Sequence, residues 1–176
     1  MSELSTDPTR VALRALTHGV YVLSVSVGQS DDYLIVSLVM QCSVEPPRIA
    51  FALSPNARIV SMLRAANGAL LSTLDMSQKP AVRRYGAPGG VRQMPVEVKR
   101  SSGGHPIPPE ASHWLQLQIF MEVSVGDHLL FVADVTDAGN AGVEKTTDSN
   151  NDSAADKSAV KFTPLTVQNS GFPYAG

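Results

Sequence analysis

The sequence predicts a mostly β protein in which six or more strands form an antiparallel sheet with two or three peripheral helices. The first reason is that short segments with alternating apolar and polar residues recur along the chain. The second is that residues 114–136 read as two such strands joined by a turn at Gly126–Asp127, which is typical of a β-hairpin. The third is the pair Pro46–Pro47, which cannot donate ladder hydrogen bonds and therefore separates two strands. Closure into a small barrel is the simplest arrangement, because it removes the exposed edges of such a sheet.

The first third of the chain predicts one helix followed by three strands. A helix is expected from Thr6–Asp7–Pro8 to about Leu16, because Thr6 is an N-cap candidate and Pro8 fits the first turn. Gly19 follows the end of this helix. Strands are then expected at residues 20–27, 33–40 and 48–53, with a turn at residues 28–32.

The remainder of the chain predicts two further helices and four strands. The helices are expected at residues 58–66 and 77–85, and the strands at residues 69–74, 114–125, 128–136 and 162–168. Asn67–Gly68 supplies the C-cap of the first of these helices. Residues 86–112 hold many Gly and Pro and read as a long loop. Residues 139–161 are almost devoid of large apolar side chains and read as a flexible insertion.

Composition and charge argue against several classes of function. The chain has 176 residues, 43% of them hydrophobic, which suits one domain spanning residues 1–176. A net charge of −2 argues against a nucleic-acid partner or an anionic membrane surface. The single cysteine, Cys42, excludes an internal disulfide and a multi-cysteine metal site, and no metal is expected. The polar start and the lack of a run of ~20 apolar residues predict a cytoplasmic protein without a membrane segment.

Three segments, taken in order, resemble a known family. They are residues 38–47 (LVMQCSVEPP), residues 69–85, and the hairpin at residues 114–135 that contains Gly126–Asp127–His128. Their order and spacing are similar to those of the flavin reductase-like, FMN-binding split-barrel family. The resemblance implies a split β-barrel that binds FMN or FAD non-covalently and forms a homodimer with flavin sites at or near the interface. It also implies that NADH or NADPH reduces the flavin, with a partner oxygenase as one destination for the reduced flavin.

The resemblance implies roles for eight residues. Those expected at the edge of the flavin ring are Ser37, Leu38, Gln41 and Cys42. Those expected at the phosphate are Ser54, Asn56 and Arg58, and His128 is expected at the reactive face. The residues themselves support a phosphate site, because a helix start offers free amides, a positive dipole end and here a guanidinium. An ordinary capped surface helix and a structural histidine are the alternatives.

Departures from the family pattern leave open a function without turnover. Ile35 is apolar where the family commonly has Thr or Ser, and Met40 is apolar near a second such position, so two contacts that the resemblance implies with the flavin are lost. Residues 168–170 (QNS) stand where relatives often have His, Arg or an aromatic residue. A non-catalytic protein that binds flavin or another planar ligand is therefore the alternative function. A ligand-free structural subunit is a further alternative.

Three expectations concern the chemistry of the site. Asp127 is expected to cap the turn rather than act as a proton partner of His128, because neighbours in a strand point to opposite faces. Cys42 is expected to be buried or half-buried and not a nucleophile, because no His or Asp is placed to activate it. The glycine pairs of the long loop lack the strand and helix context of a dinucleotide-binding fingerprint, so a nicotinamide cofactor is expected as a transient substrate.

Overall fold

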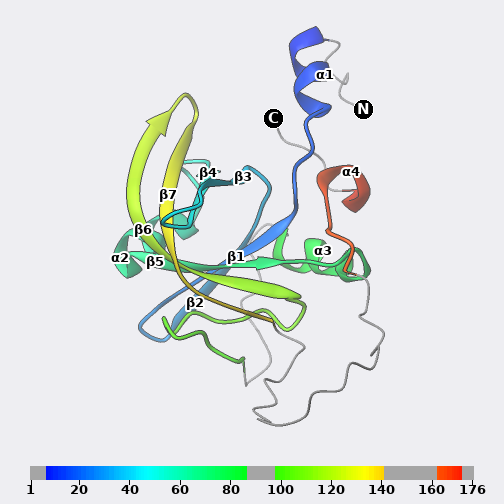
Figure 1. Cartoon of the computed structure of the whole chain (residues 1–176). Coiled ribbons are helices and arrows are strands. Elements are labelled where there is room, and N and C mark those ends of the chain that lie inside the picture. Colours follow the sequence, from blue (N-terminus) through cyan, green and yellow to red (C-terminus); the bar gives the residue numbers. More distant parts are fainter. Residues whose placement is uncertain (1–6, 87–97, 141–161, 172–176) are drawn as a thin grey trace.

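The computed structural model describes residues 7–86, 98–140 and 162–171. Seven strands form one sheet in the order β2-β1-β5-β6-β7-β4-β3, and every neighbouring pair is antiparallel. The strands are β1 (Tyr21–Val27), β2 (Ser30–Val36), β3 (Val39–Ser43), β4 (Arg48–Leu53), β5 (Gly68–Thr73), β6 (His113–Val125) and β7 (His128–Asn140). The short helices are α1 (Pro8–Arg14), α2 (Ile59–Ala66), η1 (Met76–Gln78), α3 (Pro80–Gly86) and α4 (Val167–Ser170). Figure 1 shows the curled sheet with these helices at its periphery, which confirms the predicted mostly β class.

The barrel is split between its two terminal strands. β2 and β3 stand at opposite ends of the strand order and share no ladder in the described sheet, although only Ser37 and Leu38 separate them in the chain. At this link the Val39 N–H donates to Ser37 O at 3.0 Å and turns the chain. The Ala52 N–H then donates to Leu38 O at 2.9 Å, where β3 begins to follow β4. The prediction of one strand at residues 33–40 is therefore wrong.

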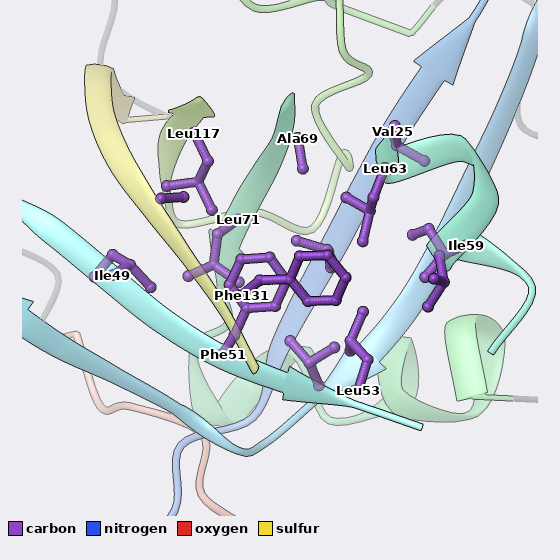
Figure 2. Close-up of a cluster of buried hydrophobic side chains, with 14 of the residues drawn as sticks. Val25, Ile49, Phe51, Leu53, Ile59, Leu63, Ala69, Leu71, Leu117 and Phe131 are labelled. Atoms are coloured by element: carbon purple, nitrogen blue, oxygen red, sulfur yellow. The ribbon is translucent and has the colours of Figure 1, made fainter. Parts of the chain in front are cut away.

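The barrel core is formed by inward side chains of the strands and by one face of α2. Phe51 of β4 and Phe131 of β7 lie opposite each other in the ladder and stack with ring centroids 5.3 Å apart (Figure 2). Ile59 and Leu63 of α2 are 1% and 0% exposed and pack in the same cluster. Burying one such side chain contributes about 1.5–3 kcal/mol. The cluster therefore fixes β4, β7 and α2 relative to one another.

A second apolar cluster lies outside the barrel, formed by β2, α3 and the C-terminal segment. Tyr33 of β2 and Tyr85 of α3 pack with ring centroids 5.3 Å apart, and Leu165, only 1% exposed, belongs to the same cluster. Leu165 is bonded on both sides of its backbone. Its carbonyl accepts the Val20 N–H at 2.8 Å, and its own N–H donates to Leu74 O at 2.9 Å. The C-terminal segment thus joins the start of β1 to the end of β5.

The C-terminal segment is not the strand predicted at residues 162–168. It forms two isolated bridges, through Pro164 and Thr166, before α4 begins at Val167. Pro164 has no N–H for a continuous ladder. Thr166 forms a capping box with Asn169 of α4, which commits the next residues to a helix. The prediction of a strand is therefore wrong.

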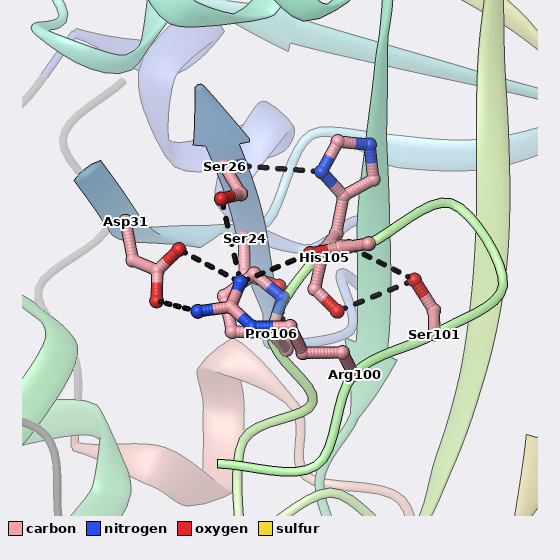
Figure 3. Close-up of polar contacts among 8 residues, drawn as sticks. Ser24, Ser26, Asp31, Arg100, Ser101, His105 and Pro106 are labelled. Carbon is pink, nitrogen blue, oxygen red and sulfur yellow. Dashed lines mark hydrogen bonds and ion pairs between the residues drawn. The ribbon is translucent and has the colours of Figure 1, made fainter. Parts of the chain in front are cut away.

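Residues 100–106, here called the clasp, cover the outer side of β1 and its neighbours (Figure 3). His105 is 5% exposed, and its Nδ1 accepts the Ser26 N–H at 3.1 Å. Arg100 pairs with Asp31 of β2 at 2.9 Å and also donates to Ser26 Oγ at 3.3 Å. Burial, and then the nearby Arg100, lowers the pKa of His105. The described part of the predicted long loop is therefore fixed by specific polar contacts.

Three other predicted features show which local sequence signals determine the structure. β4 matches the strand predicted at residues 48–53. Asn67 is the C-cap of α2, as predicted, and it has the left-handed conformation with φ of 51°. The helix predicted at residues 77–85 is divided into η1 and α3. Pro80 begins α3 as a new helix, because proline fits a first turn better than a helix interior.

At the start of the described chain, Asp7 caps α1, and its carboxylate accepts the Thr9 N–H at 3.0 Å. α1 ends at Arg14, before the predicted end at Leu16.

The insertion predicted at residues 139–161 lies outside the described residues except for its first two, which belong to β7. No helix within the described ranges is long and apolar enough to cross a membrane. The single-domain organisation stays a prediction.

Candidate flavin site

Side chains on the outside of β3, β4, β7 and β6 form an exposed apolar surface, here called the outer face. Because Phe51 and Phe131 point into the core, their neighbours along each strand point outward. One row across the strands contains Met40, Ala50, Val132 and Met121, and the next contains Ala52, Leu130 and Val123. Large apolar side chains stay exposed on these strands at Met40 (62%), Phe120 (56%), Met121 (44%), Val123 (40%) and Val125 (52%). Such a surface suits a planar apolar ligand or a second protein surface.

One end of the outer face brings together four of the predicted site residues. The ladder of β4 and β7 ends with the pair that adjoins Ser54 and His128, so these two residues follow at the same end of the sheet. Ser37 and Leu38 lie there as well, because Leu38 O accepts the N–H of Ala52, two residues before Ser54, at 2.9 Å. This end is therefore polar, next to an apolar surface.

Gln41 and Cys42 lie further along β3, on the order of 10 Å from Leu38 at ~3.3 Å per residue. The ladder shifts between Gln41 and Ser43, which makes Cys42 the additional residue of a bulge. Cys42 is exposed in the described chain, so the expected burial of its thiol is wrong. Gln41 Nε2 donates to Ser43 O at 3.1 Å, which orients its side chain along the strand.

The turn between β4 and α2 contains Ser54, Asn56 and Arg58. Ser54 Oγ accepts the Asn56 N–H at 3.3 Å, and Ser54 O accepts the Ala57 N–H at 2.9 Å. Two amides that the sequence suggested as free donors are therefore bonded within the turn. The Ser54 hydroxyl can still donate its own proton, and the Asn56 side chain is exposed. This turn can thus offer side-chain donors to an anion.

Arg58, the N-cap residue of α2, is held by a carboxylate that the sequence reasoning missed. Its Nε donates to Oδ2 of Asp32 at 2.7 Å, and its Nη2 donates to Oδ1 of the same residue. The Asp32 side chain is 6% exposed, whereas that of Arg58 is 48% exposed. The hydrogen bond to Asp32 raises the pKa of Arg58. No local sequence signal marks this contact, because it depends on the inward register of Asp32, which pairs with the core residue Val25.

His128 lies at the start of β7 with its imidazole about one-third exposed, at 33%. Its Nδ1 lies 2.7 Å from Oδ1 of Asp127, whose side chain is 93% exposed. This hydrogen bond lowers the pKa of Asp127. The expectation that Asp127 only caps the turn is therefore wrong, because the exposed hairpin tip lets the carboxylate turn back to the ring. A carboxylate partner on Nδ1 fixes the orientation of an imidazole.

Comparisons with known proteins give a consistent family. The chain matches the flavin reductase like domain over residues 13–175. Among curated proteins, diflavin flavoprotein A 1 of Synechocystis sp. is 24% identical over 138 residues, which cover 76% of this chain. The chain spans only 24% of the length of that flavoprotein.

Solved structures share the fold. The FMN-binding protein from Thermus thermophilus with bound p-hydroxybenzaldehyde has a TM-score of 0.67 at 22% identity, covering 72% of this chain and 73% of that one. The styrene monooxygenase flavin reductase from Pseudomonas putida S12 has a TM-score of 0.67 at 24% identity, covering 76% and 86% of the two chains. These likenesses show the fold, and the predicted split barrel is confirmed.

Proposed function

Because the chain belongs to the flavin reductase-like domain family, we propose that it binds FMN non-covalently and reduces it with NADH or NADPH. The observation that supports this best is the outer face, where an exposed apolar surface ends in polar side chains around Ser54 and His128. A bound flavin needs both, since its ring is planar and its phosphate is anionic. FAD fits the same proposal with a longer tail beyond the phosphate.

In this proposal the flavin ring lies along β3. β3 is a terminal strand, so one side of its backbone has no neighbouring strand in the described sheet and can bond ring carbonyls. The residues proposed at the ring edge are Ser37, Leu38, Gln41 and Cys42. The phosphate then lies at the turn before α2, where the proposed contacts are Ser54, Asn56 and Arg58.

The contribution of the chain to the reaction is alignment. FMN supplies the chemistry when bound, because its ring accepts a hydride from the nicotinamide. His128 is proposed at the reactive face, where its imidazole orients the nicotinamide or the ring. The 2.7 Å hydrogen bond to Asp127 supports this role, since it limits rotation of the imidazole. The nicotinamide nucleotide binds as a transient substrate.

We further propose a homodimer in which a second copy of the chain covers the outer face. Met121, Val123 and Val125 support it, because they are 44%, 40% and 52% exposed on one strand. Val123→Asp is expected to shift the sedimentation of the protein from dimer to monomer. Val27→Asp, at an exposed valine of β1 away from the outer face, is the matched control. A wild-type protein that sediments as a monomer at all concentrations would refute the dimer.

An absorption spectrum of the purified protein with added FMN, then NADH and NADPH under anaerobic conditions, tests the proposed function. A bound flavin band that bleaches with either nucleotide supports the reductase and identifies the electron donor. The reduced flavin would then be used in place or passed to an acceptor such as a partner oxygenase. No bound flavin band with FMN or FAD would reject the proposal.

The site assignment has its own test. Ser54→Ala with Arg58→Gln is expected to weaken FMN binding at least ~10-fold, because a hydrogen bond to a charged group contributes about 1.5–3 kcal/mol. The matched control is Ser61→Ala with Arg64→Gln on the same helix, where Arg64 pairs with Glu122 instead. Equal FMN affinity in both double variants would remove the phosphate assignment.

A protein that binds flavin without reducing it is the second candidate. Met40 favours it, because this apolar side chain is 62% exposed on the outer face, near a position where the family resemblance implies Thr or Ser. Ile35 does not distinguish a flavin reductase from a flavin-binding protein, since it is 8% exposed and packs in the second cluster outside the barrel. A bound flavin band that persists with both nucleotides would decide for this candidate. The cytoplasmic location stays a prediction.

A further inference from the structure

We propose that Asp32 is a specificity-determining residue that weakens binding of the flavin phosphate by cancelling the charge of Arg58. The proposal rests on the proposed function, in which Arg58 contacts the phosphate. Because of Asp32, contacts with the ring rather than with the phosphate supply most of the affinity for the cofactor. Replacing Asp32 by a neutral residue should therefore strengthen the binding of FMN without changing the binding of riboflavin.

The geometry makes Arg58 and Asp32 act as one unit. Two nitrogens of the guanidinium, Nε and Nη2, contact the two carboxylate oxygens of Asp32. Asp32 Oδ1 also accepts the Tyr33 N–H at 2.8 Å, so backbone and guanidinium together hold the carboxylate. With 6% of its side chain exposed, Asp32 has little water to screen its charge. A phosphate that approaches Arg58 therefore meets a pair whose net charge is zero.

In the part of the chain that the structure describes, the neighbouring ion pairs add no net positive charge to the phosphate turn. Asp127 adds a second carboxylate beside His128 at the same end of the outer face. Arg48 of β4 is paired with Asp134, and Arg64, at the far end of α2, is paired with Glu122. Within the described turn, the remaining attraction for a phosphate comes from the Ser54 hydroxyl, the exposed Asn56 side chain and the positive end of α2.

The two single variants of this ion pair are expected to change the preference for FMN over riboflavin in opposite directions, and the double variant is expected to leave it unchanged. The measured quantity is the Kd of riboflavin divided by the Kd of FMN, from fluorescence titration, because ring contacts cancel in this ratio. Asp32→Asn keeps the side-chain shape and is expected to raise the ratio about 10-fold, the size expected for one unit charge near a phosphate dianion at the protein surface. Arg58→Gln leaves Asp32 uncompensated and is expected to lower the ratio. The double variant is expected to return it to the wild-type value.

Asp31→Asn is the matched control, because Asp31 is the adjacent residue of β2 and pairs with Arg100 in the clasp instead. It should leave the ratio unchanged. A ratio that stays constant or falls in Asp32→Asn would overturn the proposal, since Asp32 would then only hold Arg58 in place. If neither riboflavin nor FMN binds the wild-type protein, the proposed function itself fails.

Salt dependence gives a second measurement that needs no variant. If the pair is neutral, the affinity of the wild-type protein for FMN should change less than ~2-fold between ~50 mM and ~500 mM NaCl, a range over which surface charges become screened. A steep loss of FMN affinity with salt, with riboflavin unaffected, would show an uncompensated cation at the phosphate and overturn the proposal.

Discussion

Gly68→Ala is expected to destabilise the protein, because a methyl group at this position has no room. Gly68 is the first residue of β5, and an added Cβ would lie 2.8 Å from Leu117 O and 3.3 Å from Nε2 of His105. Carbon–oxygen contacts in proteins ordinarily lie at ~3.3–3.6 Å. The methyl group would therefore be at least about 0.5 Å too close to a backbone atom of the paired strand β6.

The size of the effect follows from two opposing contributions. Overpacking of this kind costs about 1–3 kcal/mol. Replacing glycine by alanine also reduces the entropy of the unfolded chain, which returns about 0.4–1 kcal/mol. The net loss is expected to be about 1–2 kcal/mol, which at ~2–4 °C per kcal/mol lowers the melting temperature by roughly 2–8 °C. Thermal unfolding followed by circular dichroism measures this change.

The same substitution should disturb the clasp, which gives a readout beyond stability. The methyl group presses on His105, so the amide resonance of Ser26, bonded to His105 Nδ1, should move in an NMR spectrum. Gly126→Ala is the comparison, because Gly126 has φ of +57° and nothing within 4 Å of its added Cβ. It should lower stability through backbone strain alone and leave the Ser26 resonance in place. A melting temperature of Gly68→Ala at or above the wild-type value would refute the reasoning.

Three further predictions address other parts of the molecule. Burial lowers the pKa of His105 in the folded state, so the stability of the wild-type protein should fall as the pH drops below ~6.5. His105→Asn keeps a hydrogen-bond acceptor but cannot titrate, so its urea unfolding midpoint should lack this pH dependence. Hydrogen bonds from Ser77 and from the Thr163 N–H lower the pKa of Asp75 to about 2, so Asp75 stabilises the fold above pH ~4 and loses that effect toward pH 2. Asp75→Asn should shift the amide resonance of Thr163 in an NMR spectrum and remove the acid titration of that resonance. Phe131→Ala should cost about 3–5 kcal/mol in urea unfolding, because the ring is 1% exposed and stacked in the core; a loss under ~1 kcal/mol would show that the core refills.

Sequence reasoning recovered the elements whose signals are local and failed where pairing decides. The strand at residues 48–53 and the cap at Asn67 are predictable, because the Pro46–Pro47 break before the strand and the Asn–Gly pair after the helix are signals that act within a few residues. The division of residues 33–40 at Ser37 is not predictable in this way, since apolar residues continue across the break and only the ladder between β3 and β4 reveals it. The strand prediction at residues 162–168 is wrong for a related reason, because this segment forms only isolated bridges and no continuous ladder with another strand.

The candidate site shows the same limit at the level of single residues. Ser54 and His128 are far apart in the sequence, and it is the β4–β7 register that brings them to one end of the outer face. The predicted turn at residues 28–32 includes Asp32, whereas the observed turn contains only Gly28 and Gln29, so that β2 begins at Ser30. Its contact with Arg58 then depends on the inward register of that strand, which no local pattern records.

The C-terminal segment also has a consequence for the order of events during synthesis. Leu165 closes the second apolar cluster and bonds to the backbone at Val20 and Leu74. Among the described residues, the barrel core includes none beyond Val135, so this core can form on a chain that is still being translated. The second cluster must wait until residues 165–167 have left the ribosome exit tunnel, because Leu165 belongs to it and Val167 packs against it. The second cluster is therefore expected to close after the barrel core, at a late stage of synthesis.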